Sequence, residues 1–347
     1  MMEMPPLTQA PLQDRRLDLD EARDYAARVL ETFGTSAENA RITAQALVSA
    51  EADGLGTHGL ARLPSYAAMV ASGKIDGHAI PKARQVSSAM LAVDAGNGFA
   101  YPAIEFALPQ IEAIAREAGI GMLAIRRSSH FGVAGQPVER LATRGLVALA
   151  FSNASASIAP WGGKKALFGT NPMAFATPLK GRPPAVVDLS VAKVARGNVL
   201  AAVQRGEAIP EGWALDTEGR PTTDAKAGLA GTMVPMGEAK GTALAFIIEM
   251  MAAGLTASTF AFDAPSFFDG EGPPAAVGHV VIAIDPGRMA GDAYLDHIER
   301  MASMIENEPG ARLPGKRRLV NRERAAREGV VLTAALQKAL AGIGFHG

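Results

Sequence analysis

Residues 51–66 read Glu51-Ala-Asp-Gly-Leu-Gly-Thr-His-Gly-Leu-Ala-Arg-Leu-Pro-Ser-Tyr66 and contain the pattern G-x-G-x-x-G between Gly54 and Gly59. In doubly wound dinucleotide-binding folds this pattern follows a strand and opens a helix. Residues 40–52, which precede it here, carry apolar side chains at helical spacing and contain no strand-like run. We therefore predict a helix that stops at Gly54 in a sharp turn, and we reject a Rossmann domain at this place.

The same stretch places His58 and Arg62 four residues apart in a segment that we predict to be helical, so one turn would bring both side chains to one face. A histidine exchanges a proton near neutral pH, and an arginine can hold a planar carboxylate through two parallel hydrogen bonds. The pair suits a small 2-oxo or 2-imino acid. Two plainer interpretations stay open: a structural His58, and a surface salt bridge of Arg62 with Glu51 or Asp53.

Composition excludes several classes of protein. The 347 residues can bury a large core and are usually divided into two or three domains. A net charge of -1 without a long basic block argues against nucleic acid or an anionic membrane as a partner. The chain has no cysteine, no H-E-x-x-H motif and no close His/Asp cluster, so we expect no disulfide and no metal site.

The sequence shows no signal-peptide pattern in its first residues and no apolar run long enough to span a membrane. Residues 1–14 are rich in proline and have no apolar stretch of signal-peptide length. Residues 243–256 are apolar but are interrupted by Glu249 and too short to span a bilayer. We expect a disordered leader over residues 1–15 and a soluble, cytoplasmic protein.

Hydrophobic patterns predict a helical start, a mixed middle region and a helical tail. Residues 19–33 and 36–53 read as amphipathic helices, and from about residue 288 the tail returns to helices that could pack on them. Between them short apolar strands alternate with helices, which is typical of a mixed α/β domain. The predicted strands are 90–94, 121–125, 147–152, 172–177, 185–189 and 279–285, and the predicted helices are 102–118, 138–143 and a long buried helix at 239–253.

Polar or glycine-rich segments follow several predicted strands, where α/β proteins commonly build ligand sites. They are 128–132, 160–163, 169–172 and 188–190. A fifth segment, 237–241, places Lys240 at the start of a helix, where backbone amides and an ammonium attract phosphate. His130 or a neighbouring serine could instead cap the next helix, and Trp161 could either fill the core or stack on a flat ring.

In order and content, these motifs resemble the malate/L-lactate dehydrogenase family of the non-Rossmann type. Its members include malate, sulfolactate and ureidoglycolate dehydrogenases, diketogulonate reductase and Δ1-piperideine-2-carboxylate reductases. The resemblance covers residues 17–320. Its most specific pieces are Thr-His-Gly-Leu-Ala-Arg at 57–62, Ser-Ser-His-Phe-Gly at 128–132, Phe-Gly-Thr-Asn-Pro at 168–172, Pro-Met-Gly-Glu-Ala-Lys-Gly at 235–241 and Arg-Leu-Pro-Gly at 312–315.

The resemblance implies an α/β fold with a family-specific, non-Rossmann NAD(P)-binding domain on a mixed sheet, and a helical domain formed from both chain ends. We accordingly expect residues 16–85 and 287–347 to form the helical, dimerising domain. Residues 86–286 would form the NAD(P)-binding and substrate domain. The resemblance further implies a homodimer whose active site lies near the subunit interface.

The resemblance also implies roles for single residues. His58 would be the proton donor, with the hydroxyl of Thr57 beside it where the family commonly has serine, and Arg62 would hold the substrate carboxylate. Thr170 and Asn198 would line the substrate pocket. The cofactor would be bound by His130, Phe131, Gly132, Val133, Ala134, Asp188, Leu189, Ser190, Arg196, Gly197, Lys240, Gly315, Lys316 and Arg317.

One of these implied roles stays ambiguous, and two further positions depart from the family's pattern. In some members the histidine that matches His130 is the catalytic base, but we favour His58 because it has an arginine partner one predicted turn away. Asn198 stands where the imino-acid reductases carry an aspartate, so this chain lacks a carboxylate that would stabilise a protonated imine. Ala154 replaces a serine often found there, which removes one possible hydrogen bond to the cofactor.

We therefore expect an NAD(P)-dependent oxidoreductase that moves a hydride to or from C2 of a small 2-hydroxy or 2-oxo acid of the malate or sulfolactate type. The alternative is a reductase of Δ1-piperideine-2-carboxylate or Δ1-pyrroline-2-carboxylate. A non-catalytic nicotinamide-binding protein is the rival from another class. The basic residues Lys193, Arg196, Lys240, Lys316 and Arg317 favour NADP over NAD.

Overall fold

The computed structural model describes residues 12–346, so residues 1–11 of the expected leader lie outside the described residues. Its centre is a seven-stranded sheet of order β2-β3-β4-β11-β5-β6-β7. Among the described residues, β3 and β4 are the one parallel pair of this sheet, so the predicted mixed sheet is confirmed. The strands are β2 Lys82–Ser87, β3 Met90–Asp94, β4 Ile120–Ser128, β5 Val147–Ser152, β6 Met173–Leu179, β7 Arg182–Leu189 and β11 Val277–Ile284.

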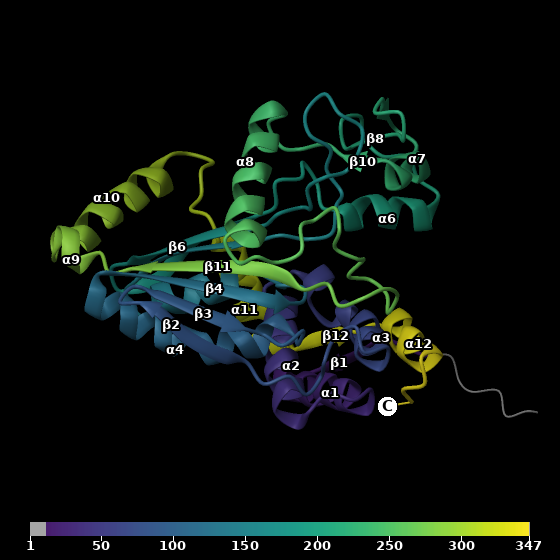
Figure 1. Cartoon of the computed structure of the whole chain (residues 1–347), viewed down its shortest axis with the longest axis horizontal. Helices are drawn as coiled ribbons and strands as arrows, with labels where there is room; N and C mark the ends of the chain where they lie inside the picture. Colours follow the sequence, from purple (N-terminus) through teal and green to yellow (C-terminus); the bar gives the residue numbers. More distant parts are fainter. Residues whose placement is uncertain (1–11, 347) are drawn as a thin grey trace, which may run out of the picture.

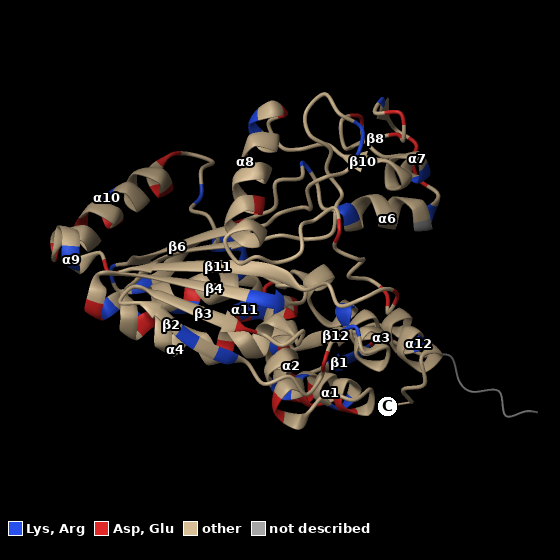
Figure 2. Ribbon diagram, in the orientation of Figure 1, with Lys and Arg blue, Asp and Glu red and all other residues tan. Residues whose placement is uncertain are grey.

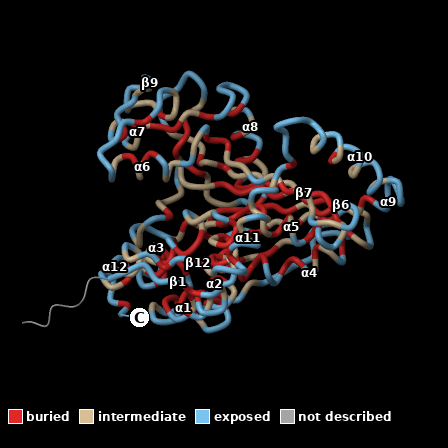
Figure 3. The backbone as a smooth tube through the Cα atoms, turned by 180° about the vertical axis from the view of Figure 1, so that it is seen from behind, coloured by how far each residue is buried: buried red, intermediate tan, exposed pale blue. Residues whose placement is uncertain are grey.

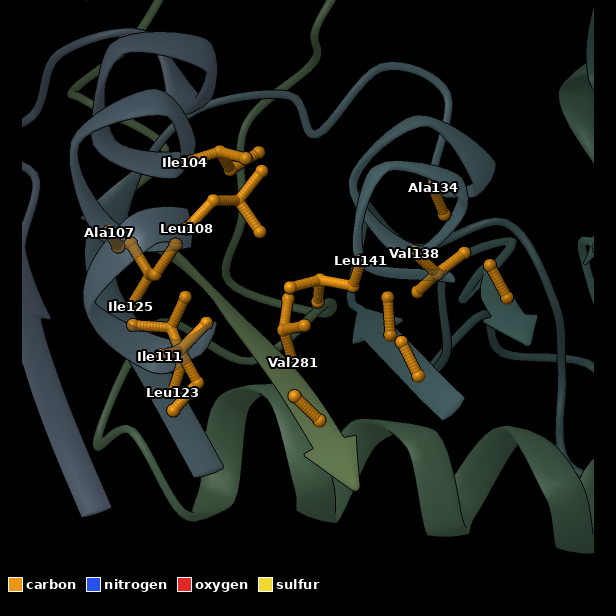
Figure 4. Close-up of a cluster of buried hydrophobic side chains, with 14 of the residues drawn as sticks. Ile104, Ala107, Leu108, Ile111, Leu123, Ile125, Ala134, Val138, Leu141 and Val281 are labelled. Carbon is orange, nitrogen blue, oxygen red and sulfur yellow. The ribbon is translucent and has the colours of Figure 1, made fainter. Parts of the chain in front are cut away.

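Helices cover both faces of the sheet (Figure 1). On one face lie α4 (Ala100–Ala118) and α5 (Gly135–Thr143), and on the other lies α8 (Ala239–Glu249), which continues as a π-helical turn, η3 (Met250–Gly254). Because successive residues of a strand point to opposite faces, Val281 of β11 joins the cluster under α4 and α5, whereas Val280 joins the cluster under α8. Figure 4 shows Leu108 and Ile111 of α4 and Leu141 of α5 in the first cluster.

Both chain ends build a helical layer beside the sheet, as expected. From the N-terminal end come α1 (Leu19–Thr32), α2 (Ala37–Ala52) and α3 (Leu63–Ala71). From the C-terminal end, α11 (Lys316–Glu328) packs on α2, and α12 (Ala334–Gly342) packs on α3. Strand β12 (Val330–Leu332) pairs with β1 (Arg15–Leu17), whose first residue falls inside the expected leader. Figure 3 shows buried stretches in this layer and in the central strands.

The helices in two segments, 239–253 and 287–307, differ from expectation. Residues 287–307 were assigned to the terminal helical domain, but α9 (Gly287–Ala290) is followed by α10 (Ala293–Asn307), which packs on β6 through Ala302 and Leu179. The helix predicted as a long buried one at 239–253 has an apolar face in solvent, since Phe246 is 54% and Ile247 53% exposed. Within residues 12–346, no helix is long and apolar enough to cross a membrane.

A small lobe between residues 190 and 236 was not predicted. It contains α6 (Arg196–Arg205), α7 (Ala225–Ala230) and a sheet of order β10-β8-β9, with β8 Ala214–Leu215, β9 Pro221–Thr222 and β10 Thr232–Met233. Strands of two residues are too short to show an alternating pattern. The backbone N–H of Lys193 donates to the carbonyl of Val234 at 2.8 Å, which ties the start of the lobe to its end.

An ion-pair network joins both chain ends to the sheet. Asp53, the C-cap of α2 and 2% exposed, accepts two hydrogen bonds from Arg322 of α11 at 2.8 and 3.0 Å. Arg322 also donates to Glu139 of α5 at 3.1 and 3.0 Å. The predicted helix stop is confirmed at Gly54, which has φ +78° and where a Cβ would collide with the side chain of Asn321.

We predict that Asp53→Leu lowers the free energy of unfolding by about 1.5–3 kcal/mol. The half-exposed Arg322 loses two charge-assisted hydrogen bonds to the buried Asp53 and keeps those to Glu139. Urea denaturation measures this change. The matched control is Asp296→Leu, which breaks an ion pair with the exposed Lys180 and should leave stability almost unchanged. Equal losses in both variants would show that the buried pair does not hold the chain ends.

Candidate active site

The stretch that carries His58 and Arg62 folds as two short turns and not as the single helix that we predicted. The turns are 3₁₀ at Gly56–His58 and Leu60–Arg62, and α3 follows. The carboxylate of Glu51 accepts from the backbone N–H of Leu60 at 3.0 Å and so bends the chain back onto α2. A Cβ at Gly59 would collide with that carboxylate, which explains the glycine.

Arg62 is buried, with 6% of its surface exposed, but it pairs with no carboxylate in the described part of the chain. It donates to Nε2 of His130 at 3.0 Å and to the carbonyl of Phe267 at 3.4 Å, and the ring of Phe268 lies 4.6 Å from the guanidinium carbon. Its Nε has no partner among residues 12–346. The salt bridge considered for it is therefore wrong, and a buried cation without an anion favours an anionic ligand.

His130 has both ring nitrogens engaged. Because arginine only donates, the Nε2 that faces Arg62 must accept. The neutral ring then carries its proton on Nδ1 and donates to the hydroxyl of Tyr66 at 2.7 Å, which lies 3.0 Å from the hydroxyl of Tyr101. Burial, and then the charge of Arg62, lower the pKa of His130 well below its usual value. The helix-cap interpretation is wrong, because α5 begins without a side-chain cap.

His58 stands beside this pair with one ring nitrogen free. Its ring stacks on that of His130 with centroids 5.6 Å apart. The hydroxyl of Thr57 lies 3.1 Å from Nδ1 of His58, and Nε2 has no hydrogen-bond partner among the described residues. Burial, followed by the charge of Arg62, lowers the pKa of His58 to about 4. The ring is thus neutral at neutral pH and can accept a proton at Nε2.

One group of the expected cofactor residues gathers where β4 and β7 end and α5 and α11 begin. The backbone N–H of Gly135 donates to Asp188 at 2.7 Å, and a Cβ at Gly315 would lie 3.0 Å from the carbonyl of Val186. The ring of Phe131 packs at a tilt of 34° against the buried His279, with the ring centroids 4.5 Å apart. The group contains His130, Phe131, Gly132, Val133, Ala134, Asp188, Leu189, Ser190, Gly315, Lys316 and Arg317.

A second group lies on the lobe and on α8. Gly197, in the first turn of α6, approaches the stretch of His58, since a Cβ there would lie 3.8 Å from the methyl group of Thr57. The side chain of Arg196 donates to the carbonyl of Leu229 at 3.1 Å and so stays within the lobe. Lys240 is exposed at the start of α8. Figure 2 shows basic residues on α6, α8 and α11.

The two other residues expected to bind the substrate, Thr170 and Asn198, lie apart from each other. The carbonyl of Thr170 accepts from the backbone N–H of Val191 at 2.9 Å, so Thr170 lies where the lobe leaves the sheet. Asn198 is exposed and lines a separate cavity of about 280 Å³ with Trp213. Trp161 is 54% exposed, so it does not fill the core.

Sequence reasoning missed three residues that shape the site. Tyr66 lies one helical turn after Arg62, so extending the four-residue spacing by one step would have found it. Phe267 and Phe268 come from a loop 205 residues further along the chain, which resembles sulfolactate-type members of the family but to which the sequence alone assigns no role.

Comparison with known proteins gives consistent matches. The family model for malate/L-lactate dehydrogenase matches residues 17–341. The chain is 52% identical over 311 residues to a (2R)-3-sulfolactate dehydrogenase (NADP(+)) of Chromohalobacter salexigens, covering 89% of this chain and 93% of that relative. It is 39% identical over 327 residues to a Δ(1)-pyrroline-2-carboxylate/Δ(1)-piperideine-2-carboxylate reductase of Pseudomonas aeruginosa, covering 94% of this chain and 98% of the relative.

A solved structure agrees. The crystal structure of Δ1-piperideine-2-carboxylate reductase from Pseudomonas syringae pvar. tomato matches with a TM-score of 0.89 and 37% identity, over 95% of this chain and 100% of that chain. These matches span nearly the whole sequence and confirm the resemblance drawn from the motifs. The chain therefore belongs to the malate/L-lactate dehydrogenase family of oxidoreductases.

Proposed function

We propose that this protein is an NADP-dependent oxidoreductase that transfers a hydride between the nicotinamide and C2 of a small 2-hydroxy or 2-oxo acid of the sulfolactate or malate type. The observation that carries the proposal is the buried guanidinium of Arg62, which has no carboxylate partner among the described residues and stands beside His58. A substrate carboxylate would supply the anionic partner that Arg62 lacks. The relative at 52% identity, named for sulfolactate and NADP(+), supports the same substrate class.

The chain's own residues have distinct tasks in this proposal. The cofactor supplies the hydride when bound. Arg62 holds the substrate carboxylate. His130 fixes the orientation of the guanidinium by accepting a hydrogen bond from one of its N–H groups. His58 gives a proton from Nε2 to the substrate oxygen in reduction and takes it back in oxidation, while Thr57 orients its ring. His58 is the better proton donor because both nitrogens of His130 are occupied.

Substrate binding and proton uptake are coupled in this arrangement. The charge of Arg62 is one cause of the low pKa of His58. A bound carboxylate compensates that charge, so the pKa of His58 rises when an acid binds. The site therefore takes up its proton with the 2-oxo acid and holds none before that.

The proposed cofactor edge has the donors that a phosphorylated dinucleotide needs. Lys240, Lys316 and Arg317 are exposed at the starts of α8 and α11. Nη1 of Arg318 is buried without a hydrogen-bond acceptor among residues 12–346 and lies 4.0 Å from the carboxylate of Asp53, and the ammonium of Lys316 lies 3.6 Å from Glu306. Arginine and lysine together suit phosphate recognition, so this donor set fits NADP better than NAD.

We further propose a homodimer located in the cytoplasm. Exposed apolar side chains on α8 and α10 support the dimer: Phe246, Ile247, Met301 and Met304 are each more than half exposed. The cysteine-free composition suits a reducing compartment. Light scattering in solution tests the dimer, and a monomer at micromolar concentration would contradict it.

Cyclic imine reduction is the second candidate, because relatives at 39% identity and the matched crystal structure carry that name. Reduction of an imine is helped by an anion near the iminium. In this site the group nearest to such an iminium is the cation Arg62, and no carboxylate among the described residues pairs with Arg62. This charge arrangement favours an oxo acid over an iminium.

Our prediction for substrate choice is that sulfopyruvate or oxaloacetate is reduced with kcat/KM at least about tenfold above that for Δ1-piperideine-2-carboxylate, and about tenfold better with NADPH than with NADH. Loss of NADPH absorbance measures both ratios. A tenfold preference for the imine would establish the second candidate. Tight NADPH binding without turnover of any substrate would indicate a non-catalytic binding protein.

A second prediction separates the histidines. His58→Gln should lower kcat about 10²-fold or more, because it removes the proton donor. His130→Ala should mainly raise KM for the acid, because it acts through Arg62. Steady-state kinetics with NADPH titration distinguishes the two, and cofactor affinity should not change in His58→Gln. The reverse pattern would assign proton transfer to His130.

The third prediction concerns pH. Because the pKa of unliganded His58 is about 4, the protonated fraction falls as pH rises. Between about pH 5.5 and 8, kcat/KM for reduction should then drop close to tenfold per pH unit, whereas kcat/KM for oxidation should stay nearly constant. The slope should disappear in His58→Gln. A reduction rate independent of pH would contradict the assignment.

A further inference from the structure

Lys74 has a buried ammonium, since 1% of its side chain is exposed. It donates to the carbonyls of Ser266, Asp269 and Glu271 at 2.7, 3.1 and 2.6 Å, and a carboxylate oxygen of Asp269 lies 3.4 Å away. A lysine has three donors, and one loop accepts all of them. The carbonyl dipoles of the loop thus compensate a charge that would be costly to bury alone.

The same loop forms a wall of the proposed substrate site. Phe267 is buried, with its carbonyl 3.4 Å from Arg62 and its ring centroid 5.5 Å from that of His130. Phe268 lies over the guanidinium of Arg62 at a cation–π distance. Neither residue belongs to a helix or strand, so their positions depend on what holds the loop.

A close contact with α3 holds the tip of the loop. A Cβ at Gly270 would lie 2.8 Å from the carbonyl of Ala68 and 3.0 Å from the hydroxyl of Ser72. The φ of Gly270 is outside the left-handed region, so this glycine is required by proximity and not by backbone conformation. Lys74 and Gly270 therefore attach the same tip of the loop to the segment that follows Arg62, one through hydrogen bonds and the other through close packing.

We propose that Lys74 is a positioning residue that holds the loop 266–271 against Arg62, so that the loop sets how tightly the substrate acid binds. With the loop in place, Phe268 shields the guanidinium partly from water, and a shielded charge attracts a carboxylate more strongly. Without it, Arg62 is hydrated and the pocket widens. This inference rests on the proposed function, because it assigns Arg62 to the substrate carboxylate.

The main test is Lys74→Met. This substitution keeps an unbranched side chain of similar length but removes the charge and all three hydrogen-bond donors. We expect KM for the 2-oxo acid to rise about tenfold or more while kcat changes less than about threefold, and the Kd of NADPH to stay constant. The matched control is Lys164→Met, which removes an exposed lysine paired with Glu218 and should change none of these values.

A second pair of variants covers the case in which Lys74→Met does not fold. Gly270→Ala pushes the loop tip off α3 without touching Lys74 and should also raise KM. Its control is Gly342→Ala, where a Cβ meets open space. If the loop 266–271 acts through Phe268, then Phe268→Ala alone should raise KM. Adding Lys74→Met to that variant should raise KM little further.

Hydrogen exchange of the peptide covering residues 266–273 gives a readout besides activity. Exchange should speed up in Lys74→Met and stay unchanged in Lys164→Met. Faster exchange with an unchanged KM would overturn the proposal, and so would unchanged exchange. If the wild type reduces no acid, the proposed function fails, whereas the exchange experiment still decides whether Lys74 holds the loop.

Discussion

The hydrogen-bonded ion pair between Asp53 and Arg322 is the constraint on which the arrangement of the site depends. Asp53 ends α2, one residue before the turn that leads to His58, and Arg322 also binds Glu139 of α5. The segment of His130 runs directly into α5. One partly buried network thus links the two segments that carry the histidines, through a helix from the far end of the chain.

Within that frame, the uncompensated charge of Arg62 organises the chemistry. It forces Nε2 of His130 to accept, which fixes the tautomer of that ring, and it contributes to the low pKa of both histidines. In the function proposed above, this charge would attract the substrate anion, and His58 would take up its proton when that anion binds. A single buried cation therefore links the binding of the acid to the protonation of the proposed donor.

Local patterns of sequence predicted the parts of the fold that depend on local physics. The strands at 90–94 and 147–152 and the helix stop at Gly54 agree with the structure, because period and backbone freedom are encoded in neighbouring residues. The turns around His58 were missed because Glu51 competes for the backbone N–H of Leu60. The loop at 266–271 could not be predicted, since Lys74 reaches it across 192 residues of sequence.

The position of α3 suggests how this fold can change substrate without changing its catalytic centre. Arg62 precedes the first residue of α3 and Lys74 follows its last turn, so a rigid helix of about 14 Å separates the proposed carboxylate anchor from the anchor of the loop. The relatives of this chain include a sulfolactate dehydrogenase and cyclic imine reductases, all of which act on carboxylates. One carboxylate anchor could therefore serve both reactions while the aromatic wall of the site differs. A loop attached through its own carbonyls suits this, because its side chains can be replaced while the backbone contacts to Lys74 remain.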